Sequence, residues 1–150
     1  YLRPQFDYIL LDCPAGIEQG FKNAVAGADR AIVVTTPEVS AIRDADRIIG
    51  LLYREQISNI QLIINKVNPR YIEKGISVSL REALSFLSVD LLGVVYEDED
   101  MIRSNNKGFA AVKEKNVVYD CFASMASRLE GKRSELPKYR GKSLIQKLFG

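Results

Sequence analysis

Short apolar runs that end in polar or turn-forming residues recur along this chain and alternate with segments of helical periodicity. Four such runs, at residues 6–12, 31–35, 61–65 and 91–96, are rich in isoleucine, valine or leucine. Runs of this length are typical of strands that are buried on both faces of a parallel sheet. The alternation predicts an α/β fold in which helices wrap a mainly parallel, doubly wound sheet.

The segments between these runs have the spacing of amphipathic helices. One face of residues 39–53 is apolar at helical intervals, at Ile42, Ala45, Ile49 and Leu52. Ser79 and Glu82 match a capping box at the start of a helix that we expect to extend to about residue 87. Further helices are expected at residues 18–28 and at about residues 117–129, the latter ended by Gly131.

Length and composition limit what the chain can be. Its 150 residues suffice for one domain with a buried core, and 47% of them are hydrophobic. Because histidine is absent from the sequence, nucleophilic pairs with histidine and histidine-containing metal sites are excluded. No apolar run in the sequence approaches the roughly 20 residues needed to cross a bilayer. The two cysteines are too few for a disulfide framework and favour a reducing cytoplasm.

Charge is distributed unevenly between the body of the chain and its end. Residues 131–150 contain six basic residues and one acid, although the net charge of the whole chain is only +2. Residues 1–130 are therefore net acidic, which argues against nonspecific binding of nucleic acid. We divide the chain into a domain at 1–130, a basic linker at 131–141 and an amphipathic helix at 142–150.

The helix expected at 142–150 has the character of a peripheral membrane anchor. Its apolar stripe consists of Leu144, Ile145, Leu148 and Phe149, and Lys147 flanks that stripe. Isolated helices shorter than about 12 residues are marginal in water, so we expect this one to form where an interface covers its apolar side. Basic residues add attraction to anionic lipid, and such a helix lies in the membrane surface without crossing it. The alternative is a helix that docks on its own domain.

The first apolar run leads into a candidate nucleotide site, where residues 8–16 read YILLDCPAG. In open α/β sheets, ligands bind at the carboxyl ends of the strands, and Asp12 stands at such an end. Its carboxylate can hold Mg²⁺ through water, and the backbone of Gly16 can approach a phosphate. The alternative is that Asp12 caps a turn and that residues 14–16 only redirect the chain.

The sequence contains no phosphate-binding loop to accompany Asp12. Residues 141–143 read GKS, the end of the pattern G-x-x-x-x-G-K-[ST], but that pattern requires glycine where the chain has Leu136. The residues before it do not form an apolar strand either. We therefore expect the chain alone neither to bind ATP tightly nor to hydrolyse it.

Together these motifs resemble the MinD/ParA family of deviant-Walker P-loop ATPases, and within it the members that select the division site. The resemblance rests on LLDCPAGIE at 10–18, ADRAIVVTTPEVSAIRDADRIIGLL at 28–52, INKVN at 64–68, LLGVV at 91–95 and LIQKLFG at 144–150. It covers nearly the whole chain. In this family the phosphate-binding loop follows the first strand, upstream of all these motifs, so the resemblance implies that N-terminal strands of the fold are missing here.

The resemblance also implies cofactors and roles for particular residues. The cofactors are ATP and Mg²⁺; Asp12 would organise the metal and its water, and Gly16 would contact the γ-phosphate. Asn65 would read adenine, to which the donor and acceptor of an asparagine amide are suited, and Glu97 would flank the base. From the residues alone, Asn65 could instead bond the local backbone at a strand end. Glu97 could equally belong to the solvated start of a helix.

Partners and location follow from the same resemblance. The charged face of residues 39–53 would bind MinC and MinE-like proteins through Arg43, Asp44 and Asp46, with Glu38 near the seam of an ATP-bound homodimer; the alternative is a merely solvated face. The protein would be cytoplasmic and peripheral on the inner face of the cell membrane, and would regulate placement of the division septum. Two other functions stay open. One is a related ATPase that places the flagellum, and the other is a membrane-tethered interaction module that binds no nucleotide.

Overall fold

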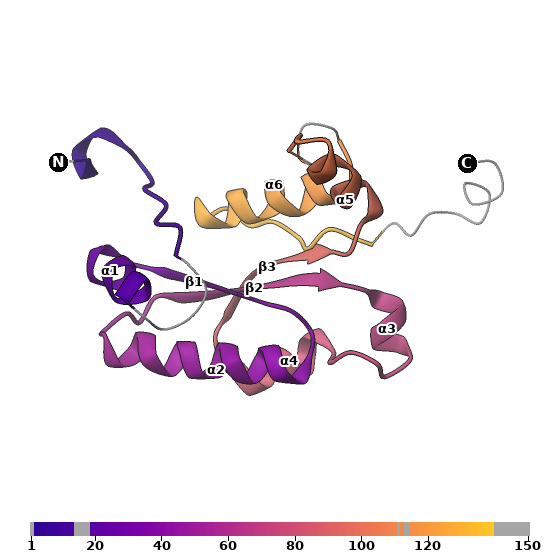
Figure 1. The fold of residues 1–150 in the computed structure, drawn as a ribbon, viewed down its shortest axis with the longest axis horizontal. Helices are drawn as coiled ribbons and strands as arrows, with labels where there is room; N and C mark the ends of the chain where they lie inside the picture. Colours follow the sequence, from indigo (N-terminus) through magenta and orange to yellow (C-terminus); the bar gives the residue numbers. More distant parts are fainter. Residues whose placement is uncertain (1, 14–18, 111, 113–114, 140–150) are drawn as a thin grey trace.

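The computed structural model describes residues 2–13, 19–110, 112 and 115–139 of the chain. Within them the elements follow the order η1 (Arg3–Gln5), α1 (Gln19–Gly27), β1 (Ala31–Thr35), α2 (Val39–Arg54), β2 (Ile60–Val67), α3 (Pro69–Glu73), α4 (Leu80–Leu87), β3 (Asp90–Tyr96), α5 (Glu99–Asn106) and α6 (Val117–Leu129). Helices separate each strand from the next along the chain (Figure 1). The described elements thus form the α/β fold that the sequence predicts.

The described sheet has three parallel strands in the order β1–β2–β3. Ala31 of β1 is opposite Ile60 of β2, and Gln61 of β2 is opposite Asp90 of β3. Parallel neighbours require crossover connections, which α2 supplies between β1 and β2, and which α3 and α4 supply between β2 and β3. The carboxyl ends of the strands therefore meet at one edge of the sheet, close to α3 (Figure 1).

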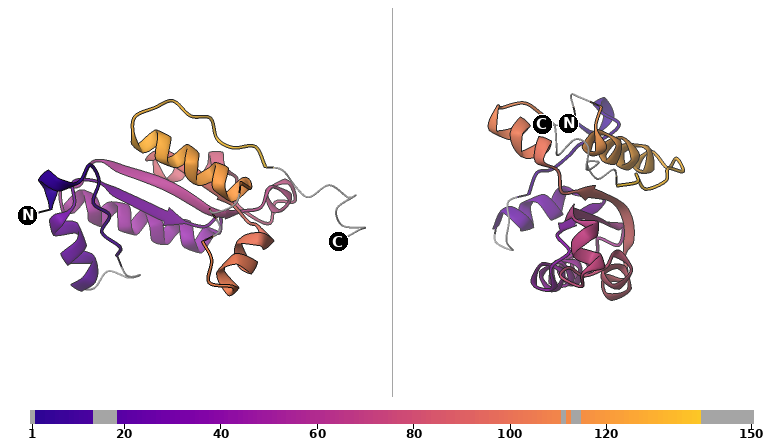
Figure 2. Two further views of the ribbon diagram at one scale, coloured as in Figure 1. Left: turned by 90° about the horizontal axis from the view of Figure 1, so that it is seen from above. Right: turned by 90° about the vertical axis from the view of Figure 1, so that its right-hand side faces the viewer.

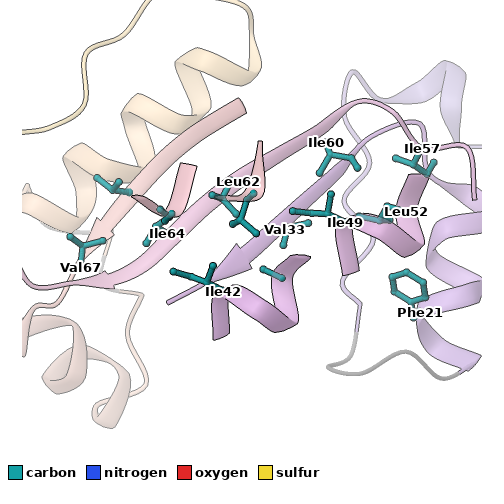
Figure 3. Packing of buried hydrophobic residues seen from close by; sticks show 14 residues of the cluster. Phe21, Val33, Ile42, Ile49, Leu52, Ile57, Ile60, Leu62, Ile64 and Val67 are labelled. Atoms are coloured by element: carbon teal, nitrogen blue, oxygen red, sulfur yellow. The ribbon is translucent and has the colours of Figure 1, made fainter. Parts of the chain in front are cut away.

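Helices cover both faces of this sheet. α2 and α4 lie on one face, and α6 lies on the other face over β3 (Figures 1 and 2). The main core fills the space between the sheet and α2, where Leu62 and Ile64 of β2 are fully buried among residues that include Ile42 and Ile49 (Figure 3). The four apolar positions expected on residues 39–53 are the buried positions of α2.

α6 approaches β3 closely because Gly93 has no side chain. A Cβ atom at this position would lie 2.3 Å from Cγ of Met125, well inside van der Waals contact. Around this point Leu92 and Val95 of β3 pack with Cys121 and Met125 of α6 in a second, smaller core cluster. The glycine in the middle of a strand thus sets the distance between helix and sheet.

The helix boundaries agree with most of the expected ones. Ser79 Oγ accepts a hydrogen bond from the Glu82 backbone N–H at 3.2 Å, and the Glu82 carboxylate accepts from the Ser79 N–H at 2.9 Å, which confirms the capping box. α6 ends before Gly131, whose φ of 77° suits only glycine without strain. α3 was not predicted because five residues are too short for a clear apolar period. α5 corresponds to the helix that the alternative interpretation of Glu97 expects, although it begins at Glu99.

The expectation of a strand at residues 6–12 is wrong. These residues belong to no strand, and the side chains of Phe6, Leu10 and Leu11 are 57%, 82% and 50% exposed. A strand needs a hydrogen-bonded neighbour, and in the described part of the chain β1 pairs only with β2. Its neighbouring residues make side-chain contacts instead: Arg3 pairs with Asp29 at 3.2 Å, an exposed pair that adds little stability.

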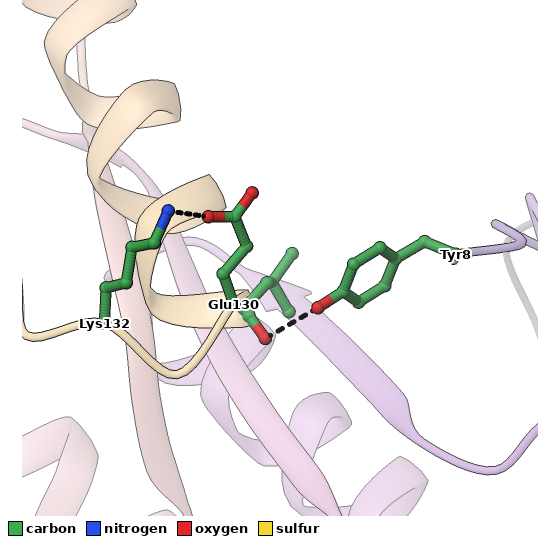
Figure 4. Close-up of polar contacts among 4 residues, drawn as sticks. Tyr8, Glu130 and Lys132 are labelled. Atoms are coloured by element: carbon green, nitrogen blue, oxygen red, sulfur yellow. Dashed lines mark hydrogen bonds and ion pairs between the residues drawn. The ribbon is translucent and has the colours of Figure 1, made fainter. Parts of the chain in front are cut away.

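A second contact of this segment reaches the end of α6. The Tyr8 hydroxyl donates a hydrogen bond to the Leu129 carbonyl at 3.1 Å (Figure 4). Beside it, Lys132 pairs with Glu130, and that carboxylate raises the pKa of the lysine (Figure 4). Residues 2–13 therefore lie toward the amino-terminal ends of the strands, away from α3 (Figures 1 and 2).

After α6 the chain reverses at Gly131 and returns beside the helix. We call residues 132–139 the strap, since they run back along α6 toward the carboxyl ends of the strands (Figures 1 and 2). Ser134, Leu136, Pro137 and Tyr139 of the strap are half-buried, and Leu136 packs against the main core. The strap falls within the linker expected at 131–141, and it is packed on the domain.

Candidate functional site

The candidate base-reading residue, Asn65, lies in a bulge near the end of β2. The pairing of β2 with β3 shifts register between Ile64 and Val67, and Lys66 has a φ of 55°. The Asn65 side-chain oxygen accepts a hydrogen bond from the Lys66 backbone N–H at 2.9 Å. This is the local bond that the alternative interpretation of Asn65 expects. It fixes the side chain at the carboxyl edge of the sheet, where the role of adenine reader stays a prediction.

Asn68 and Glu97 connect the loops that follow β2 and β3. The Asn68 side-chain amide donates to the Glu97 carboxylate at 2.8 Å, and its oxygen accepts from the Arg70 backbone N–H at 3.1 Å. The Glu97 N–H also donates to the Val67 carbonyl at 3.0 Å. Glu97 therefore braces the loop beside Asn65, and its proposed contact with a base stays untested.

Sequence reasoning missed this role of Asn68, although a signal was present. Asn68 precedes Pro69, and asparagine followed by proline is a common start of a helix, with the asparagine as N-cap and the proline in the first turn. α3 begins in this way. Its cap holds the loop after β2 in the position from which Asn68 reaches Glu97.

The other two candidate nucleotide residues are not placed beside Asn65 and Glu97 in the described structure. Asp12 is exposed within the unpaired segment 2–13. Gly16 falls within residues 14–18, which lie outside the described residues. The structure thus brings Asn68 and Glu97 together in the loops near Asn65, whereas it does not place Asp12 beside them. No cluster of three acidic or cysteine residues suited to a metal ion occurs in the part of the chain that the structure describes.

The candidate partner face of α2 is exposed as expected. Arg43, Asp44 and Asp46 all point away from the buried face of the helix. Asp44 pairs with Arg47 at 3.6 Å, but both side chains are more than 70% exposed, so this pair contributes little to stability. Glu38 is the N-cap residue of α2, and its carboxylate accepts a hydrogen bond from the Thr36 hydroxyl.

An open groove adjoins this charged face between α2 and α4, and the sequence analysis did not predict it. Its volume is about 340 Å³, and its lining comprises Val39, Ile42, Arg43, Val78, Glu82, Ala83 and Phe86. Val39 and Phe86 are 56% and 57% exposed. Hydrogen bonds from Ser79, first from its hydroxyl and then from its backbone, lower the pKa of Glu82. The groove thus combines an apolar floor with a cation, Arg43, and an anion, Glu82.

The expected membrane-binding residues lie outside the described residues. Leu144, Ile145, Lys147, Leu148 and Phe149 all fall within 140–150. Among the helices that the structure describes, none has the length and apolar character to cross a membrane. The last described residue, Tyr139, packs against Tyr96 at the carboxyl end of β3.

Comparison with known proteins relates most of the chain to one group. No family model matches the chain. It is 48% identical over 132 residues to the septum site-determining protein MinD of Bacillus subtilis (strain 168), which covers 87% of this chain and 49% of that protein. The MinD protein of Synechocystis is also 48% identical over 132 residues, covering 87% and 50%. The chain thus spans about half the length of these curated relatives.

Solved structures give the same result for the fold. MinD in a MinC:MinD complex from Aquifex aeolicus superposes with a TM-score of 0.86 at 37% identity, covering 92% of this chain and 57% of that one. MinD of Pyrococcus horikoshii, solved with Mg-ADP, gives a TM-score of 0.73 at 27% identity, covering 86% and 52%.

The parallel sheet wrapped by helices, together with these superpositions, defines the chain as part of an α/β domain of the P-loop NTPase type. The match extends beyond the class to the sequence itself. The chain is a homologue of the MinD septum site-determining proteins.

Proposed function

We propose that the chain is part of an ATP-dependent protein of the MinD type, which places the division septum and attaches reversibly to the membrane. The observation that carries this proposal is the 48% identity over 132 residues to septum site-determining proteins. The matched residues make up 87% of the chain.

ATP and Mg²⁺ are the proposed cofactors, supported by the Mg-ADP bound to the related Pyrococcus horikoshii protein. Asn65 would read adenine, and the bond between Asn68 and Glu97 would hold the two loops around the base. Asp12 and Gly16 remain the proposed residues for Mg²⁺ and the γ-phosphate. Because this sequence holds no phosphate-binding loop, we expect the chain alone not to hydrolyse ATP.

MinC is the proposed protein partner, supported by the solved MinC:MinD complex of a related protein. Arg43, Asp44 and Asp46 offer charges for such a partner, and the adjoining groove offers an apolar surface with Phe86 exposed at it. Burial of an exposed aromatic side chain at the centre of an interface contributes more binding energy than exposed charges at its rim. A MinE-like protein and a second copy of the chain, near Glu38, are the other proposed partners.

Residues 142–150 are the proposed membrane anchor. The helix would place Leu144, Ile145, Leu148 and Phe149 among the acyl chains and Lys147 at anionic head groups. One short helix binds weakly, but two on a dimer act at high effective concentration and bind much more tightly. Dimerisation would therefore control residence at the inner face of the membrane.

Sedimentation of the full chain with anionic vesicles tests the anchor. Phe149→Glu and Leu148→Glu place a charge on the apolar stripe, and each should abolish sedimentation because a charged side chain cannot enter the acyl region at low cost. Gln146→Glu makes the same charge change on the polar side of the helix and serves as the matched control.

The expected result is retention of vesicle binding by Gln146→Glu and loss of it by the other two variants. Vesicles of neutral lipid should bind the unaltered chain more weakly, because each basic residue near an anionic surface adds about 1 kcal/mol. Sedimentation of all three variants to the same extent as the unaltered chain would show that the tail is not the membrane anchor.

A further inference from the structure

The strap is held to the domain by side chains of α6. Arg128 donates from Nε and Nη2 to the Ser134 carbonyl at 2.9 and 2.8 Å, and from Nη1 to the Leu91 carbonyl at 3.1 Å. The Ser124 hydroxyl, which is buried, donates to the Glu135 carbonyl at 2.9 Å. One half-buried guanidinium therefore joins the strap to both α6 and β3.

The far end of the strap is held by Tyr96, the last residue of β3. The Tyr96 hydroxyl donates to the Pro137 carbonyl at 2.8 Å, and its ring contacts that of Tyr139 with 5.2 Å between centroids. Burial raises the pKa of Tyr96, so the phenol stays protonated and keeps donating this bond at neutral pH. The described chain thus ends at a fixed point on the domain.

Tyr96 also adjoins the candidate base site. The next residue is Glu97, which is bonded to Asn68 across the two loops. A displacement of Glu97 would move the backbone of Tyr96, and through its hydroxyl and ring it would move Pro137 and Tyr139. Two covalently adjacent residues, Tyr96 and Glu97, therefore connect the loop beside Asn65 to the end of the strap.

We propose that residues 132–139 are a fixed strap that anchors the root of the C-terminal tail at the carboxyl edge of the sheet, with Tyr96 as the positioning residue that links it to the candidate base loop. The link to membrane binding rests on the proposed function, whereas the anchoring of the strap does not. The strap limits the reach of the tail. Residues 140–150 can extend at most about 40 Å from Tyr139, whereas a chain released from Lys132 onward can extend about 65 Å.

A single introduced tryptophan reports on the attachment of the strap to the domain, because the sequence contains no tryptophan of its own. In the full chain carrying Tyr139→Trp, acrylamide quenching of the tryptophan measures its exposure, and far-UV circular dichroism verifies the fold. Tyr96→Phe removes only the bond to the Pro137 carbonyl, Tyr96→Ala also removes the ring contact, and Glu97→Ala removes the bond to Asn68. Tyr53→Ala changes an exposed tyrosine on α2 and serves as the control.

We expect quenching to rise about twofold with Tyr96→Phe and to approach that of free indole with Tyr96→Ala. Glu97→Ala should give a smaller rise, and Tyr53→Ala no change. The attachment of the strap would be refuted if the tryptophan were fully exposed in the Tyr139→Trp chain without further substitution. It would also be refuted if Tyr96→Ala left the quenching unchanged in a folded chain. Unchanged quenching in Glu97→Ala would overturn the link to the base loop.

NMR relaxation of backbone ¹⁵N in the unaltered chain gives a second measurement that needs no substitution at Tyr139. The order parameters of the strap should be about 0.85, the value of rigid backbone, and values below about 0.6 would contradict the proposal. This measurement also decides the matter where Tyr96→Ala fails to fold. Because both measurements use no lipid, a fixed strap together with absent vesicle binding would refute the membrane anchor while leaving the strap in place.

Discussion

At the scale of single residues, Gly93 sets how closely α6 packs on the sheet. Gly93→Ala brings a methyl group to 2.3 Å from Cγ of Met125, so the helix or the Met125 side chain must move. We expect the free energy of unfolding to fall by about 1–3 kcal/mol, the usual cost of overpacking a core. Urea denaturation followed by circular dichroism measures this change.

Gly50 provides the matched control, because it lies on the exposed side of α2 and a Cβ there would meet nothing within 4 Å. Gly50→Ala should raise the free energy of unfolding by about 0.5–1 kcal/mol, since alanine restricts the unfolded chain and favours helix. A Gly93→Ala variant as stable as the parent would show that α6 is not closely packed on β3.

The buried thiol of Cys121 makes the stability of the fold depend on pH in the alkaline range. Burial raises the pKa of its thiol above the ordinary value of 9.0, and the charge of Asp120 acts in the same direction. The folded state therefore holds the proton more tightly than the unfolded state. The stability that the protonated thiol contributes is fully present below the pKa of the thiol in the unfolded chain. It is lost as the pH rises through the pKa of the thiol in the folded chain.

Thermal unfolding between pH 8 and pH 10.5 tests this effect. The parent should lose stability over this range, and Cys121→Ala, although less stable at pH 7 because of the cavity, should lose less. Cys13 is exposed, so Cys13→Ala should retain the decline of the parent. A loss of stability of the same size in Cys121→Ala would mean that other groups cause it. Tyr96 would be the first candidate, because burial also raises its pKa.

At the scale of elements, the spacing of apolar residues in the sequence was enough to predict the bounds of α2, β1, β3 and α6 almost to the residue. α2 and α6 are long enough to show a clear helical period, and β1 and β3 are short runs dominated by valine, leucine and isoleucine. The same signal failed for residues 6–12, because an apolar run indicates burial in a sheet but carries no information on whether a neighbouring strand is present. Within the candidate site, Asn65 could be singled out only through the resemblance to the MinD/ParA family, because from the residues alone it could instead bond the local backbone. The bond between Asn68 and Glu97 could not, since it joins loops that only the folded sheet brings together.

The exposed apolar side chains of β1 and of residues 2–13 predict self-association of the chain. Leu10 of residues 2–13 is 82% exposed. Val34 is 58% exposed on β1, a strand that pairs on one side only in the described residues. Edges of this kind join other chains unless they carry charge or are covered. We expect the isolated chain to associate at micromolar concentrations, and Val34→Lys to shift it toward the monomer.

Sedimentation velocity over a concentration series measures this shift. Ile76→Lys is the control, because Ile76 is 66% exposed in the loop between α3 and α4, away from β1. Equal association of both variants would mean that β1 is not the contact.

At the scale of the whole molecule, two opposite ends of the sheet have different roles. The carboxyl ends of the strands carry Asn65, Glu97 and the end of the strap, whereas residues 2–13 lie toward the amino ends (Figures 1 and 2). The strap, which precedes the proposed membrane anchor along the chain, therefore ends next to the proposed base site. The sequence predicts both features separately, but their proximity depends on the reversal of the chain at Gly131, which only the fold reveals.

The position of the division septum, measured in the cells that make this protein, tests the central claim most directly. The gene would carry Leu148→Glu in one strain and the control Gln146→Glu in another, with equal protein levels verified by immunoblotting. We predict septa displaced toward the poles and small cells without chromosomes in the first strain, and septa at mid-cell in the second. Septa placed normally in both strains would contradict a membrane-attached regulator of septum placement.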